Sequence, residues 1–199
     1  MKFSRALIFA LLVPVGLSAQ ATAGTPPTNP ILTSFRGRIL PLHRNLAQAF
    51  DSIPADKFSY KPTPAQLTIG YVAQHVTNDN YFFCNAFGDM KGTRPDEDTS
   101  TPDSVKATWP KDKLVAKLKE SFTFCETALG QLDDAKLGSM ISVTAGGQTR
   151  QIPLAGRVLG HALDLADHYS QIANYMRLNG ILPPTALPRP GRGGGSGSN

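Results

Sequence analysis

Several signatures of common enzyme classes are missing from this sequence of 199 residues. It contains no glycine-rich phosphate-binding loop and no Gly-x-Ser-x-Gly turn, so it lacks the marks of P-loop nucleotide enzymes and of α/β-hydrolases. The paired Glu-x-x-His pattern of di-iron helical bundles is also absent, which argues against a dinuclear metal site. Any active site must therefore be built from a small stock of reactive side chains, which includes four histidines and two cysteines.

A strong charge of one sign is missing too. The chain has 20 Lys and Arg against 15 Asp and Glu. Residues 1–23 hold two of the bases and no acid, so the rest of the chain carries 18 bases against 15 acids, a net charge of +3. No run of five basic residues occurs, which argues against nucleic acid as a partner. The hydrophobic content of 41% is enough to build a core.

Long hydrophobic runs are absent except at the N-terminus. Lys2 and Arg5 precede an apolar stretch from Ala6 to Leu17, and Ala21-Thr22-Ala23 has the small-x-small pattern of a cleavage site. The stretch is too short to span a bilayer comfortably, so residues 1–23 are predicted to be a signal peptide of a periplasmic or secreted protein. An uncleaved N-terminal anchor is the alternative. After cleavage we expect no membrane association.

The rest of the chain is predicted to be one all-α domain over residues 24–187, followed by a flexible Gly/Ser-rich tail over residues 188–199. Apolar residues recur every three or four positions in four segments, which indicates four amphipathic helices. Gly180, followed by Pro183 and Pro184, marks the end of the last one. A weak alternation around Gly146-Gly147 suggests a short hairpin. The expected helices cover residues 30–52, 68–87, 110–129 and 153–179.

The two cysteines provide a check on how the helices are arranged. A connection of about 22 residues between the second and third helices is long enough to run back along a bundle, so that these helices are parallel. Cys84 and Cys125 lie at similar depths in them, whereas antiparallel helices would separate the two by roughly 15 Å, too far for a bond. An exported protein meets an oxidising compartment, so we expect a Cys84–Cys125 disulfide. Two buried free thiols are the alternative.

The candidate site lies on the last helix and the second helix. Asp164 and His168 are one turn apart, and an i, i+4 pair of this kind can close on one metal ion. His75, on the second helix, is the third candidate ligand. His161 is about 10.5 Å from His168 along the axis, so it is an alternative ligand or a supporting residue. The plain alternative is a buried histidine that is hydrogen-bonded to a neighbouring carboxylate.

Two further polar residues are read as peripheral. Asp79 lies one turn after His75 and could support that histidine, but a solvated carboxylate at the helix edge is the simpler interpretation. His43 lies one residue off the apolar stripe of the first helix, so we expect it at a solvated edge. No general base can be named from the sequence, and the catalytic residues stay unassigned.

Two stretches carry a family resemblance. They are IPADKFSYKPTPAQLTIGYVAQHV, residues 53–76, and DHYSQIANYMRLNGILPP, residues 167–184. With the four-helix layout, they resemble the DinB-like (YfiT-like) superfamily of four-helix bundles, whose members are grouped as metalloenzymes. The similarity covers about residues 30–184.

The resemblance implies a fold and a site. The fold is an up-down-down-up four-helix bundle with a long crossover between helices 2 and 3. The site is one divalent transition metal, Zn, Ni, Fe or Mn, held by three histidines. His75 and His168 match two of them, and the third position holds Asp164, which departs from the all-histidine pattern and would give a His2Asp set. His161 would then be a displaced substitute or a supporting group.

The same resemblance implies a range of activities. Relatives include thiol-dependent transferases, an isomerase and many proteins without a known reaction. We therefore expect a metal-dependent enzyme of hydrolase or thiol-transferase type that acts on a small molecule. A homodimer is one oligomeric state compatible with this expectation. A non-catalytic periplasmic domain that binds a metal or a small molecule is the alternative. DNA repair is opposed by the export signal and by the modest charge.

Overall fold

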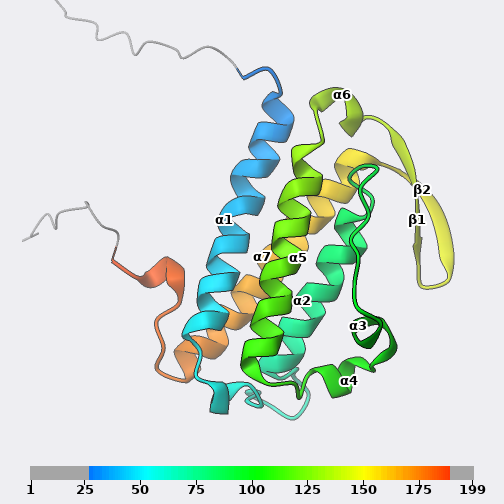
Figure 1. Ribbon diagram of the computed structural model, residues 1–199. Coiled ribbons are helices and arrows are strands. Elements are labelled where there is room, and N and C mark those ends of the chain that lie inside the picture. The colour runs from blue at the N-terminus through cyan, green and yellow to red at the C-terminus, as the bar shows by residue number, and fades with distance from the viewer. Residues whose placement is uncertain (1–26, 189–199) are drawn as a thin grey trace, which may run out of the picture.

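The computed structural model describes residues 27–188, and it is mostly helical (Figure 1). The predicted signal peptide and residues 189–199 of the predicted tail lie outside the described residues. In the described part, seven α-helices and one two-stranded sheet are found. No helix between residues 27 and 188 is long and apolar enough to cross a membrane.

Four helices are long, and the connections between them contain the short elements. The long helices are α1 (Pro30–Ser52), α2 (Ile69–Cys84), α5 (Lys111–Gly130) and α7 (Leu154–Leu178). The short elements are the 3-10 turns η1 (Ala55–Lys57) and η2 (Pro184–Ala186), the helices α3 (Asp96–Ser100), α4 (Asp103–Lys106) and α6 (Asp134–Leu137), and the strands β1 (Met140–Ala145) and β2 (Gln148–Pro153).

The predicted helix boundaries hold closely except at the end of α2. This helix ends at Cys84, not at Phe87. The Asn85 side chain accepts a hydrogen bond from the backbone N–H of Gly92 at 2.7 Å, so the residues after Cys84 already belong to the crossover. The predicted hairpin is present as β1 and β2, which pair antiparallel. Gly146 and Gly147 have φ values of 57° and 75° at its turn, a conformation that glycine adopts without strain.

The second and third long helices are parallel. Asn80 of α2 donates to the hydroxyl of Ser121 of α5 at 2.8 Å, and four residues further along both helices Cys84 is bonded to Cys125. The partners follow each other in the same order along both helices, so the chains run in the same direction. The predicted disulfide is therefore present, and α3 and α4 lie on the crossover that it spans.

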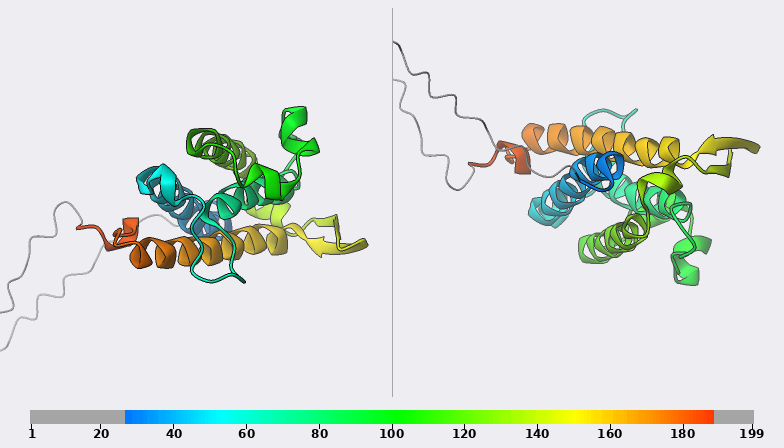
Figure 2. Two further views of the ribbon diagram at one scale, coloured as in Figure 1. Left: turned by 90° about the horizontal axis from the view of Figure 1, so that it is seen from below. Right: turned by 90° about the horizontal axis from the view of Figure 1, so that it is seen from above.

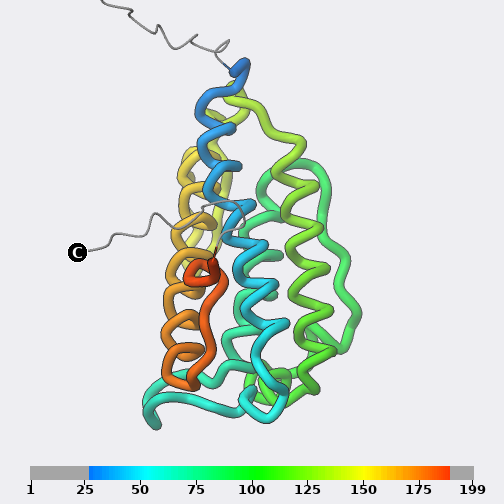
Figure 3. The backbone as a smooth tube through the Cα atoms, turned by 90° about the vertical axis from the view of Figure 1, so that its left-hand side faces the viewer, coloured from blue at the N-terminus to red at the C-terminus, as the bar shows by residue number. Residues whose placement is uncertain are grey.

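The other long helices run against these two. Arg36 near the start of α1 donates to the carbonyl of Leu129 near the end of α5, while Asp51 at the end of α1 pairs with Lys119. α1 is thus antiparallel to α5. Figure 2 shows α7 along one side of the other long helices, with the hairpin extending from one of its ends. In Figure 3 the segment that ends in η2 turns back beside α1 and α7.

Close backbone approach fixes the start of α2. The backbone N–H of Gly70 donates to the carbonyl of Phe58 at 2.8 Å, and a Cβ atom at Gly70 would overlap the carbonyl oxygen of Ala107. By contrast, a Cβ at Gly37 in α1 would meet no atom within 4 Å. Glycine at position 70 therefore lets α2 dock against the crossover, and it positions the first turns of the helix that carries His75.

The buried core lies between the long helices and includes one residue placed wrongly from the sequence. His43 is only 2% exposed, not solvated at an edge. Its ring stacks on Phe122 with 4.4 Å between centroids, and its Nδ1 lies 3.2 Å from the carboxylate of Glu126. Burial is the main cause that lowers the pKa of His43 to about 4, so the ring is neutral at pH 7.

Candidate metal centre

The candidate centre lies where α2 and α7 pack antiparallel. Each helix presents one carboxylate and one imidazole, one turn apart: His75 and Asp79 from α2, and Asp164 and His168 from α7. Residues four apart on a helix lie on the same face, so each pair points toward the other helix together. The ring centroids of His75 and His168 are 4.9 Å apart, with their planes nearly perpendicular at 88°.

Asp79 lies at the middle of the group. Its Oδ2 is 3.1 Å from Nε2 of His75 and 3.9 Å from Nε2 of His168. On the other side, Nε2 of His168 is 3.6 Å from Oδ1 of Asp164. One nitrogen or oxygen atom from each of His75, Asp79 and His168 therefore lies within 4.8 Å of the other two. Both imidazoles and the Asp79 carboxylate thus direct polar atoms into one small volume, and Asp164 lies at its edge beside His168.

Burial makes the two carboxylates costly to ionise. It is the largest cause that raises the pKa of Asp79, to about 7, and the neighbouring Asp164 raises it further. Burial also raises the pKa of Asp164, while His168 and His75 oppose that effect. In addition, Oδ2 of Asp164 is buried and has no hydrogen-bond partner among the described residues. Nearby positive groups thus offset only part of the cost of burying the two carboxylates.

These residues fit a divalent cation by their donor types and their charges. Imidazole nitrogens with carboxylate oxygens suit zinc and the other first-row divalent metals. A cation between Asp79 and Asp164 would offset their mutual repulsion and would give the buried Oδ2 of Asp164 a partner. Gln171 helps to orient one ligand, because its Oε1 lies 3.4 Å from Nδ1 of His168 and can only accept. That contact favours the proton on Nδ1 and leaves the Nε2 lone pair directed at the centre.

The predicted residues and the observed group differ in one member. His75 and His168 come together with Asp79, whereas Asp164 lies beside this group and reaches it through His168, at 3.6 Å. From the sequence, Asp79 was interpreted as a solvated carboxylate or a weak support for His75, yet its side chain is only 20% exposed. The signal that could have identified it was available, because His75 and Asp79 have the same i, i+4 spacing as Asp164 and His168.

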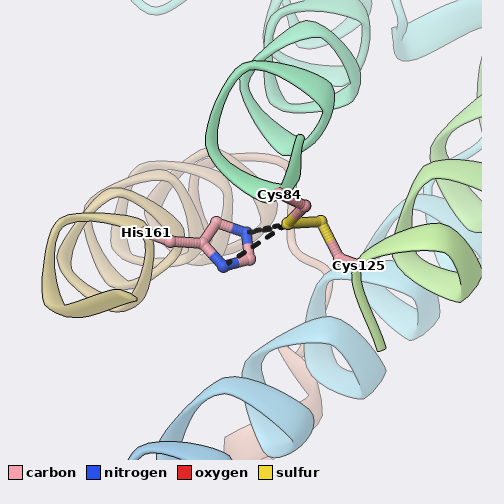
Figure 4. Close-up of side chains that lie close together, drawn as sticks. All are labelled: Cys84, Cys125 and His161. Atoms are coloured by element: carbon pink, nitrogen blue, oxygen red, sulfur yellow. Dashed lines mark hydrogen bonds between the residues drawn. A yellow bond between two sulfur atoms is a disulfide. The ribbon is translucent and has the colours of Figure 1, made fainter. Parts of the chain in front are cut away.

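His161 lies in a different environment, inside the core. It is fully buried, and its Nε2 donates to the side-chain carbonyl of Asn80 at 2.9 Å. Burial is the main cause that lowers its pKa to about 3, so the ring is neutral. Figure 4 shows His161 beside the disulfide, with its ring nitrogens 3.9–4.0 Å from Cys84 Sγ. Sulfurs bonded to each other are not thiolates, and thiolate is the form that binds metals.

Comparison with known proteins gives a family and a fold. Residues 42–172 match the model of the DinB superfamily. Among solved structures, a DinB-like protein from Bacillus cereus ATCC 10987 superimposes with a TM-score of 0.60 at 16% identity, over 76% of this chain and 95% of that one.

Two further structures give the same result. A conserved protein from Enterococcus faecalis has a TM-score of 0.56 at 13% identity, over 73% of this chain and 95% of that one. A DinB-like protein from Bacillus subtilis has a TM-score of 0.53 at 17% identity, over 81% and 100% of the two chains. At these identities the likeness concerns the fold alone. No curated protein matches the chain.

Proposed function

Because the chain belongs to the DinB superfamily, we propose that it is an exported, metal-dependent enzyme of hydrolase or thiol-dependent transferase type. In this proposal, the four long helices form an up-down-down-up bundle, and His75, Asp164 and His168 hold a single divalent ion with Asp79 as a fourth ligand. The convergence of two imidazoles and two poorly compensated carboxylates from α2 and α7 carries the proposal.

When bound, the ion would lower the pKa of a coordinated water, polarise a carbonyl oxygen or hold a thiolate. The chain's own residues have simpler tasks. His168 is held by Gln171, so its Nε2 faces the centre. Asp79 faces both imidazoles from α2, and its carboxylate would bring negative charge to the ion.

Metal analysis of the purified protein tests this function directly. Protein expressed with its N-terminal segment and recovered from the exported fraction should begin near Gly24 and contain about one equivalent of a transition metal, measured by inductively coupled plasma mass spectrometry. His75→Ala and His168→Ala should each lose most of it, since each removes one of very few ligands. Asp167→Asn is the matched control, because it changes an exposed carboxylate beside His168.

Thermal unfolding provides the second readout. Wild-type protein should gain about 2.7 kcal/mol of stability when the free metal is at one hundred times its dissociation constant. If Zn, Ni, Mn and Fe all leave the melting temperature unchanged, the proposed metal centre does not exist and the catalytic proposal falls with it.

One observation favours the second candidate, a non-catalytic exported binding domain. Asp79 already contacts His75 at 3.1 Å, so this part of the group can persist as an internal hydrogen bond without an ion. If that domain binds a small molecule and not a metal, the wild type would contain no metal, and His75→Ala would destabilise the protein without changing its metal content.

A further inference from the structure

The next feature on the α2–α7 face is a buried arginine whose charge has no acidic partner in contact. Arg157 in the first turn of α7 is only 6% exposed. No carboxylate among the described residues forms an ion pair with it, and its Nε atom is buried without a hydrogen-bond partner there. Burying a guanidinium without a compensating anion is costly, and such groups are normally paired.

Neutral groups hold this guanidinium in place. It donates to the backbone carbonyl of Phe82 in the last turn of α2, and its carbon lies 3.9 Å from the ring centroid of Phe82 and 4.3 Å from that of Phe83. These contacts explain the position of the side chain, and they also cap the end of α2. They use few of its five N–H donors and leave its charge available.

Arg157 also lines a cavity of about 420 Å³ between the end of α2 and strand β1. Ile141 and Val143 share the half-buried face of β1 and give the cavity an apolar wall, while the hydroxyls of Ser142 and Thr144 bond to Gln151 and Thr149 across the hairpin. Lys91 adds a second positive charge at the cavity, and its amine donates to the backbone carbonyls of Asn85 and Gly88. A positively charged cavity with partly apolar walls suits an organic anion.

The cavity and the candidate centre are close on the same two helices. Phe82, which holds the guanidinium, follows Asp79 by three residues, or about 4.5 Å along α2. Arg157 precedes Asp164 by seven residues, which is two turns along the same face of α7. Arg157 and Asp79 also influence each other's pKa electrostatically. The cavity therefore lies within about two helical turns of the centre along α7.

We propose that Arg157 binds the carboxylate or phosphate of a small organic anion whose apolar body lies in the cavity beside β1. The assignment of this anion as the substrate depends on the function proposed above, whereas the anion site itself does not. A guanidinium suits both oxyanions because its planar fork matches two of their oxygens. The reacting part of such a substrate would lie at the centre formed by His75, Asp79, Asp164 and His168.

Nuclear magnetic resonance of metal-free protein tests the site. Benzoate and phenyl phosphate are titrated in the presence of a chelator, with benzamide as the uncharged analogue of the same shape. We expect saturable shifts of the Arg157 Nε–H and of the amides of residues 141–144, with a dissociation constant on the order of 1 mM for the better anion. The tighter of the two identifies the oxyanion, and benzamide should bind at least about tenfold more weakly.

Variants complete the test. Arg157→Gln should weaken binding of the anion roughly tenfold or more, while Arg38→Gln at an exposed position of α1 should leave it unchanged. If Arg157→Gln does not fold, Val143→Trp provides the test, because it narrows the cavity while Arg157 is kept, and it should also weaken binding. Equal affinity for benzamide and the anions, or shifts confined to other regions, would overturn the proposal. The chelator keeps this result independent of the metal analysis.

Discussion

Asp79 gives the most specific prediction about the centre, because its ionisation is expected to oppose folding. The carboxyl has an ordinary pKa of 3.8, and burial is the main cause that raises it to about 7 in the folded protein. The folded state therefore binds the proton more tightly than the unfolded state does. Stability contributed through this group is present below about pH 4 and is lost as the pH rises toward 7.

The magnitude follows from the same shift. At about 1.36 kcal/mol per pH unit, the change from 3.8 to about 7 corresponds to roughly 4 kcal/mol of destabilisation above neutral pH. Asp79→Asn removes the titrating group and keeps its shape. In metal-free protein, the variant should equal the wild type in stability near pH 4 and exceed it by up to about 4 kcal/mol at pH 8.

Urea unfolding at several pH values, with a chelator present, measures this difference. Asp167→Asn is the control, since that carboxylate is exposed and its removal should change the free energy of unfolding only slightly. Adding a saturating metal at pH 8 should make the wild type more stable than Asp79→Asn, because only the wild type keeps the charged ligand. If the free energies of unfolding of the Asp79 variant and the wild type differ by the same amount from pH 4 to pH 8, the reasoning is refuted.

Two further predictions concern the scaffold. Replacing Cys84 and Cys125 together by Ala should lower the free energy of unfolding by about 4 kcal/mol, the loop-closure value for a crosslink between residues separated by 41 positions. Urea unfolding under non-reducing conditions measures this loss, and a loss below about 1 kcal/mol would contradict the prediction. Gly70→Ala should destabilise the folded protein by about 1–3 kcal/mol, because the added Cβ would overlap the carbonyl of Ala107. Gly37→Ala should be neutral or should stabilise the protein by about 0.5–1 kcal/mol. Thermal melts that rank the two variants in the opposite order would refute the packing argument.

Local patterns explain why much of the fold was predictable. The helix over residues 30–52 and the hairpin turn at Gly146-Gly147 depend on periodicity and turn chemistry, which act between neighbours in the chain. The disulfide could also be inferred, because helix length and direction fix the heights of Cys84 and Cys125. The end of α2 was missed because a contact between Asn85 and Gly92 decides it, and periodicity does not report such a contact.

The candidate site was predictable in part, for a related reason. Asp164 and His168 could be paired from their spacing on one helix, and His75 was named as the third candidate on the second helix, where the family resemblance also matched it. The burial of Asp79 depends on how closely α7 covers α2, which the sequence does not state. His43 and His161 show the same limit, since one lies on Phe122 and the other beside the disulfide, and both surroundings arise only from helix packing.

The covalent link between α2 and α5 has a consequence for proteolysis. The crossover lies between the two bonded cysteines, so one cut anywhere in it produces two polypeptides that stay attached to each other. One fragment carries His75 and Asp79, and the other carries Asp164 and His168. A nicked molecule could therefore retain both halves of its centre in an oxidising compartment, and it would separate into two bands on a gel only after treatment with a reductant.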